Sequence, residues 1–218
     1  MGLGKLFRRD PRAAAAGRLY ARVVEQARLP AFYQEGGVPD SVDGRFELIA
    51  LHAFLLLQRL KAEGREGADL AQKLFDTMFA DMDASLRELG AGDLGVPPRI
   101  KRMISGFYGR VAAYEAGLAG SDEGLAEALR RNLYGTVEPA LADTLAVAAY
   151  MRRATAELAG PPAAALQSGE VVFTPARQEG AGTARNEALT RQGRFPMVPR
   201  PTRRPSAQER RAEDPGHG

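Results

Sequence analysis

The chain has 218 residues, 44% of them hydrophobic and 26% charged, a composition typical of a soluble globular protein. It has no cysteine and two histidines, His52 and His217, which excludes disulfides, thiolate catalysis, iron–sulfur clusters and Cys- or His-rich metal sites. The sequence shows no catalytic triad, carboxylate dyad or nucleotide-binding loop. We therefore expect no catalytic residue, metal, cofactor or small-molecule substrate.

The net charge of +3 is unevenly distributed. Residues 1–18 carry five basic and one acidic side chain, residues 19–159 carry 16 and 20, and residues 160–218 carry nine and six. A slightly acidic body between two basic ends indicates surface contacts with membrane phosphates or ribosomal RNA rather than an active site. The longest apolar run, residues 48–57, is too short to cross a bilayer.

The first half of the chain predicts three helices, because apolar residues recur at spacings of three and four. The first covers about residues 12–28, and residues 30–40 form a loop with at most a single turn. The second begins at an aspartate or serine cap and covers about residues 40–63. It is apolar nearly all round, so we expect it at the centre of the core. The third covers about residues 68–89.

The second half predicts three more helices. The fourth follows Gly95, has proline in its first turn and continues to about Leu118. The fifth begins at a Ser121 cap and ends near residue 134. The sixth covers about residues 139–159, and its expected buried face consists of Leu141, Leu145, Ala148 and Ala149.

Beyond about residue 168 the chain is rich in Gly, Pro and Arg. One apolar island, residues 169–175, is able to dock on the body, but the rest has too little apolar surface to offset an ordering cost of about 1–2 kcal/mol per residue. We predict an all-α fold, a single multi-helix domain of about six helices over residues 12–167. A flexible basic N-terminus (1–11) precedes it, and a mostly disordered basic tail (168–218) follows it.

Four long segments succeed one another along the chain: FYQEGGVPDSVDGRFELIALHAFLLLQRL (32–60), LAQKLFDTMFADMDASLRELGAGDLGVPPRIKRM (70–103), FYGRVAAYEAGL (107–118) and LRRNLYG (129–135). They resemble the ubiquinol–cytochrome c chaperone family in its alphaproteobacterial form. The resemblance implies a non-catalytic, all-helical chaperone that binds newly made cytochrome b and promotes assembly of ubiquinol–cytochrome c reductase, respiratory complex III.

Mitochondrial members of that family act with a small partner protein near the ribosomal tunnel exit. The resemblance therefore implies three partners besides nascent cytochrome b: the ribosome, the inner-membrane surface and a small assembly partner. It also implies a cytoplasmic protein that associates peripherally with the inner membrane or the ribosome. The alternative function is a ribosome- or nucleic-acid-binding helical protein that acts through its basic ends.

The stretch 92–102 is the sharpest candidate for a binding surface, since a Gly-containing loop leads into a basic helix start. The candidate ribosome- or membrane-binding residues are Arg99, Lys101, Arg102 and Arg110, and the alternative is a solvated basic face. Cytoplasmic loops of a membrane client are rich in Lys and Arg, so they favour an acidic contact. The candidate client-binding residues lie off the apolar stripe of the third helix and are Asp76, Asp81 and Asp83.

Two further groups of residues have two interpretations each. Asp43 and Arg45 are either exposed handles for a client or parts of a helix start, where an acid complements the helix dipole. Met78, Met82 and Met103 form either an adaptable client surface or core packing, and a client groove can open where that core reaches the surface.

His52 lies in the apolar centre of the second predicted helix. With no second internal histidine and no cysteine to complete a metal or haem site, it is interpreted as a buried or half-buried histidine bonded to a carbonyl or carboxylate.

Overall fold

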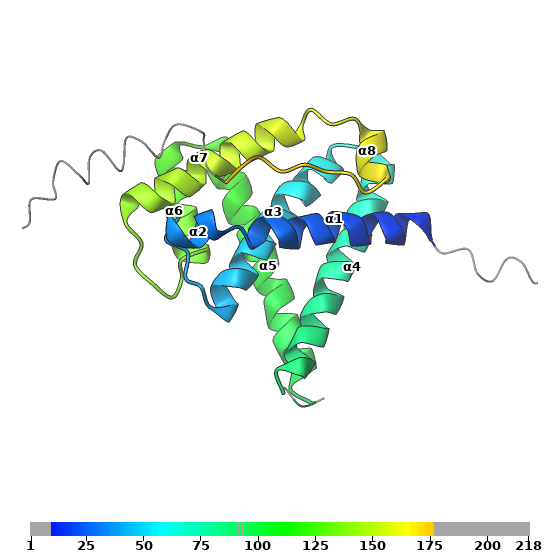
Figure 1. Ribbon diagram of the computed structural model, residues 1–218, viewed down its shortest axis with the longest axis horizontal. Coiled ribbons are helices and arrows are strands. Elements are labelled where there is room, and N and C mark those ends of the chain that lie inside the picture. Colours follow the sequence, from blue (N-terminus) through cyan, green and yellow to red (C-terminus); the bar gives the residue numbers. More distant parts are fainter. Residues whose placement is uncertain (1–9, 91, 93, 177–218) are drawn as a thin grey trace, which may run out of the picture. The chain divides into compact units, whose positions relative to one another are not determined.

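The computed structural model describes residues 10–90, 92 and 94–176, and this part of the chain forms helices and connections without a strand. The all-α prediction is therefore confirmed. Figure 1 shows the helices, which are α1 (Pro11–Ala27), α2 (Pro30–Gln34), α3 (Val42–Lys61), α4 (Gly64–Glu88), α5 (Val96–Ala119), α6 (Asp122–Asn132), α7 (Leu141–Leu158) and α8 (Ala163–Gln167). The six long helices correspond to the six predicted ones, and α2 and α8 are short additions.

Local signals explain where several helices begin. The Asp10 carboxylate accepts a hydrogen bond from the backbone N–H of Arg12 at 2.9 Å, which caps α1. The Ser41 and Ser121 hydroxyls accept from backbone N–H groups three residues later at 3.1 and 3.2 Å, which caps α3 and α6. Each cap satisfies an N–H that has no partner inside its helix.

Helix α3 lies at the centre of the core, as its apolar composition predicted. It packs against α1, α4 and α7, and its buried apolar side chains point to several sides. They are Leu48, Ala50, Leu51, Ala53, Phe54, Leu55, Leu56 and Leu60. The other helices thus cover α3 and leave one of its ends, around residues 42–49, to form part of a groove.

The expected buried face of α7 is right for Leu145, which is half-buried against the core, and for Ala148, but wrong for Leu141 and Ala149. Leu141 is 69% exposed and Ala149 is also exposed, whereas Ala148 is buried together with Val147, Tyr150 and Met151. The helix is rich in alanine, so its periodicity gives little contrast between faces. Contacts with α3 and α6, and the burial of the Tyr150 ring, select the face that packs inward.

The apolar island docks on the helical body. Val171 and Phe173 are buried, and the Gln26 side-chain amide donates to the Thr174 carbonyl at 2.8 Å. The chain enters this segment through Gly169, whose φ of +81° is a conformation that favours glycine. The predicted disorder of the tail from residue 177 onward lies outside the described residues.

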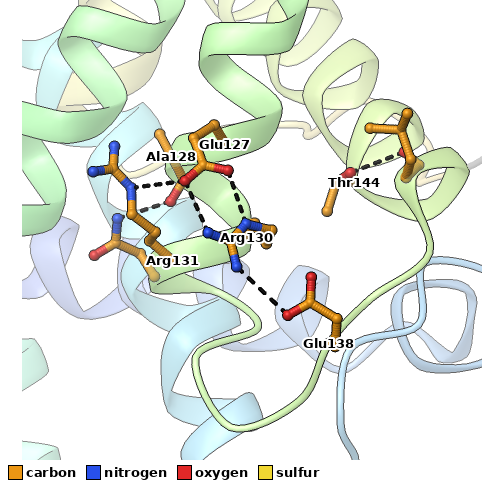
Figure 2. Close-up of polar contacts among 8 residues, drawn as sticks. Glu127, Ala128, Arg130, Arg131, Glu138 and Thr144 are labelled. Atoms are coloured by element: carbon orange, nitrogen blue, oxygen red, sulfur yellow. Dashed lines mark hydrogen bonds and ion pairs between the residues drawn. The ribbon is translucent and has the colours of Figure 1, made fainter.

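The LRRNLYG segment joins α6 to α7. Arg130 pairs with Glu127 at 2.8 Å and reaches Glu138 at 3.5 Å, while Arg131 also approaches Glu127 (Figure 2). The buried Tyr134 hydroxyl donates to the carbonyl of Gly36. The Tyr134 bond therefore ties the α6–α7 connection to the segment after α2, and the arginine pairs stay within α6 and that connection.

Helices α4 and α5 form an antiparallel pair. The end of α4 and the start of α5 lie away from α1, α7 and α8 in Figure 1. Gly90, with a φ of +84°, ends α4, and two prolines lie in the first turn of α5. None of the described helices combines the length and hydropathy needed to span a bilayer.

Candidate functional site: a groove between α3, α4 and α5

A groove of about 690 Å³ opens where the start of α3, the end of α4 and the first half of α5 meet. That volume is within the range of pockets that hold ligands or anchor side chains of a partner. The groove is partly open to solvent, so a chain segment can enter it.

The floor of the groove is apolar. Five side chains from the three helices line it, and several of them are only half-buried although they pack on the core: Phe46, Ile49, Met82, Leu86 and Met103. Met82 is 9% exposed, whereas Met78 is fully buried and absent from the groove. Of the three methionines considered as a client surface, Met82 and Met103 thus line a groove, and Met78 belongs to the core.

One wall of the groove contains an ion pair between two helices. Arg110 on α5 donates from Nε and Nη2 to the two carboxylate oxygens of Glu47 on α3, and its guanidinium lies 5.8 Å from the centroid of the Phe46 ring. The side chains of Arg110 and Glu47 are 19% and 11% exposed. Burial, opposed by the guanidinium, raises the pKa of Glu47 above its ordinary value. Both residues of the pair line the groove.

Arg110 therefore does not project freely with the other cations, because its charge is neutralised by Glu47 inside the molecule. Glu47 is the residue that the sequence reasoning missed. The available signal was an acidic side chain within the most apolar helix, where an unpaired carboxylate is unfavourable.

The other three predicted cations, Arg99, Lys101 and Arg102, are exposed in the first two turns of α5. Within the part of the chain that the structure describes, none of them forms an ion pair. Arg99 and Arg102 line the groove and Lys101 does not. The three cations thus surround the start of the helix rather than forming one flat patch.

None of the three predicted client-binding acids lines the groove, and only Asp76 and Asp83 share a face of α4. Asp76 accepts from the Gln72 amide at 2.8 Å, and Asp83 pairs with Arg87 at 2.6 Å. Asp81 accepts from the Tyr20 hydroxyl on α1 at 2.7 Å. Each carboxylate thus has a partner within the chain, and Asp81 helps to join α4 to α1.

The acids that do line the groove are Asp43, Glu47 and Glu88. Arg45 also lines it and pairs with Asp40 at 2.8 Å on the surface. Gly44 explains why the start of α3 packs closely, since a Cβ there would lie 2.0 Å from the Pro39 carbonyl oxygen. The rim of the groove therefore carries charges of both signs around an apolar floor.

His52 is fully buried, and both of its ring nitrogens are hydrogen-bonded to other groups of the protein. Its Nδ1 lies 2.7 Å from the Leu48 carbonyl, which can only accept, so Nδ1 carries the proton and Nε2 accepts from the Tyr150 hydroxyl at 2.8 Å. Gln26 then donates to the Tyr150 oxygen at 3.1 Å. Burial lowers the pKa of His52 to about 4. The described residues contain no group of three or more potential metal ligands.

The sequence and the fold are similar to those of known proteins. A family model described as ubiquinol–cytochrome C chaperone matches residues 34–173, which include α3 to α8 and the whole groove. The chain belongs to this family.

The chain is similar to several named proteins. Ubiquinol-cytochrome-c reductase complex assembly factor 1 of Xenopus laevis is 29% identical over 119 residues, 55% of this chain and 60% of that protein. Protein CBP3, mitochondrial, of Saccharomyces cerevisiae is 31% identical over 108 residues, 48% of this chain and 32% of that protein. The chain thus spans less than two thirds of the length of these relatives.

A solved structure supports the fold. The crystal structure of the Cbp3 homolog from Brucella abortus superposes with a TM-score of 0.70 at 39% identity, and the match covers 77% of this chain and 93% of that chain. The family resemblance seen in the sequence is therefore confirmed, together with the helical chaperone fold.

Proposed function

We propose that this protein is a non-catalytic assembly chaperone for ubiquinol–cytochrome c reductase, respiratory complex III. Its membership in the chaperone family supports an assembly role. The names of its relatives, which are assembly factors for the same complex, agree with it. The client that we propose is newly made cytochrome b, as the family resemblance implies.

The observation that carries the proposal is the apolar floor of the groove between α3, α4 and α5. Cytochrome b is a membrane protein, so its segments expose apolar side chains until they are inserted and assembled. A helix with one apolar face can insert two or three side chains into such a groove. The thioethers of Met82 and Met103 can repack around different side chains.

The charges at the rim suit a client with loops of mixed charge. Asp43 and Glu88 are able to pair with the Lys and Arg residues that flank membrane segments on the cytoplasmic side. We therefore move the proposed client contact from Asp76, Asp81 and Asp83 to the groove. Contacts with the ribosome near the tunnel exit and with a small assembly partner remain predictions from the family resemblance.

A photo-crosslinking amino acid at Met103, in the groove floor, tests this proposal during synthesis of cytochrome b. The same group at Val172, which is 85% exposed and outside the groove, is the matched control. We expect a cytochrome b adduct from position 103 and none from position 172. Equal labelling at both positions, or no adduct at 103, would contradict the groove as the client site.

A second test fills the groove without touching the core. Ser85 lines the groove, whereas Ser105 is exposed on α5 and does not line it. The substitution Ser85→Trp should lower the amount of assembled complex III, and Ser105→Trp should not. If both variants fold and support the same level of complex III, the groove does not hold the client.

A further inference from the structure

The connection between α4 and α5 presents two large apolar side chains to solvent. Leu89 is 68% exposed and Leu94 is 96% exposed. In an ordinary soluble protein, single exposed leucines need no explanation, but here both lie at one end of a helical pair. That end lies away from α1, α7 and α8 in Figure 1. We refer to residues 89–102, as far as they are described, as the α4–α5 tip.

Cations follow these leucines along the chain, at the start of α5. Arg99, Lys101 and Arg102 occupy the first two turns of α5, all three are exposed, and none pairs with an acid in the described part of the chain. Residues 86–103 carry four basic and two acidic side chains, a net charge of +2. Because the cations lie on different sides of α5, a flat surface that touches the tip end-on can meet all three.

This order, apolar side chains at the extremity and free cations one or two turns behind, matches the layers of a membrane surface. Leucine side chains gain free energy when they enter the acyl boundary, while Lys and Arg reach lipid phosphates at the headgroup level. We propose that the α4–α5 tip docks on an anionic lipid bilayer, with Leu89 and Leu94 inserted and Arg99, Lys101 and Arg102 at the headgroups.

The leucines distinguish lipid from ribosomal RNA, the other anionic partner. Phosphates on RNA attract the same cations, but RNA gives no burial to an aliphatic side chain that is 96% exposed. A docked tip also sets the neighbouring groove at the bilayer surface, because Leu89, Arg99 and Arg102 line its mouth. The inference does not depend on what the groove binds.

Two residues allow the tip to be tested without altering the groove, since neither Leu94 nor Lys101 lines it. The measurement is co-sedimentation of the full chain with vesicles of phosphatidylcholine and phosphatidylglycerol in a 70:30 ratio, and with pure phosphatidylcholine. We expect binding to the anionic vesicles and little to the neutral ones.

The variant Lys101→Glu should reduce partitioning about 25-fold, because each unit of charge near an anionic surface changes it about fivefold. Leu94→Asp should reduce it by about tenfold or more. The matched controls are Arg65→Glu, a cation at the opposite end of α4 that forms no ion pair in the described part of the chain, and Val172→Asp, an exposed apolar residue outside α4 and α5. Neither control should change partitioning by more than about twofold.

A parallel titration with ribosomal RNA separates the two anionic partners. If Leu94→Asp binds the vesicles as tightly as the unaltered chain, the tip is not inserted and the proposal is wrong. It is also overturned if Lys101→Glu weakens binding to RNA but not to vesicles. Crosslinking of cytochrome b at position 103 can succeed or fail independently of these results, so failures of the two proposals are distinguishable.

Discussion

Glu47 on α3 and Arg110 on α5 are 63 residues apart in the sequence and form a half-buried, two-point ion pair beside the Phe46 ring. The pair joins two of the three helices that line the groove. It also explains why Arg110 differs from the three exposed cations at the start of the same helix. The contrast between Arg110 and Arg99 can be measured.

Replacing Arg110 by alanine should lower the free energy of unfolding by about 3–5 kcal/mol, because it leaves the Glu47 carboxylate buried without its partner. Arg99→Ala, at an exposed position, should change it by less than about 0.5 kcal/mol. Urea unfolding of both variants is the measurement. The double variant Glu47→Met with Arg110→Met should be more stable than Arg110→Ala, and equal losses for Arg110→Ala and Arg99→Ala would show that the pair does not form.

The protein should lose stability in mild acid because His52 is buried in its neutral form. Its pKa in the folded protein is about 4, below the ordinary value of 6.5, so the unfolded chain binds the proton more readily between these values. As pH falls from about 6.5 to 4, this group alone should cost about 3 kcal/mol of stability. His52→Gln should remove this part of the pH dependence, which unfolding curves at several pH values can measure. An identical pH slope in the variant would mean that His52 is not buried in its neutral form.

Phe54 is 1% exposed at the centre of the core and packs against the Tyr114 ring at a centroid distance of 5.5 Å. Phe54→Ala should therefore destabilise the fold by about 3–5 kcal/mol through lost burial and a cavity. Val172→Ala, at a position that is 85% exposed, is the control and should have an effect below about 0.5 kcal/mol. Thermal and urea unfolding should rank the two variants in that order; a small loss for Phe54→Ala would instead indicate an adaptable, client-accessible site.

The docked segment 168–176 and the chain beyond it should differ in their contribution to stability. Phe173 is 9% exposed and its ring lies 5.5 Å from His52, so Phe173→Ala should lower the unfolding free energy by about 3 kcal/mol. Deleting residues 180–218 removes none of the described contacts and should leave the melting temperature nearly unchanged. A drop of many degrees on deletion would mean that the tail contributes to the packed body.

Much of the fold was predictable because its signals are local. Serine caps, prolines in first turns and glycines after last turns mark where α3, α5 and α6 begin or end, and each acts through atoms only a few residues away. The apolar composition of α3 by itself required a central position. The apolar island at 169–175 was a possible docking segment within a tail expected to be mostly disordered, and the structure docks it on the body.

The candidate site was not predictable in the same way, because it depends on which side chains of different helices meet. Helical spacing placed Arg110 off the apolar stripe of α5, but only the packing of α3 against α5 brings Glu47 to it. Helical spacing is compatible with the i,i+4 pair of Asp83 and Arg87, but it could not show that Asp81 bonds to Tyr20 on α1.

The sequence by itself determined the helical class, the helix boundaries, the central helix and the family. The tertiary structure alone decided the buried face of α7, the pairing of Arg110, the contact of Asp81 with Tyr20 and the position of the groove. The reason is physical: caps and periodicity act over three or four residues, whereas the phase of an alanine-rich helix and the partner of a charge are set by the neighbouring helix.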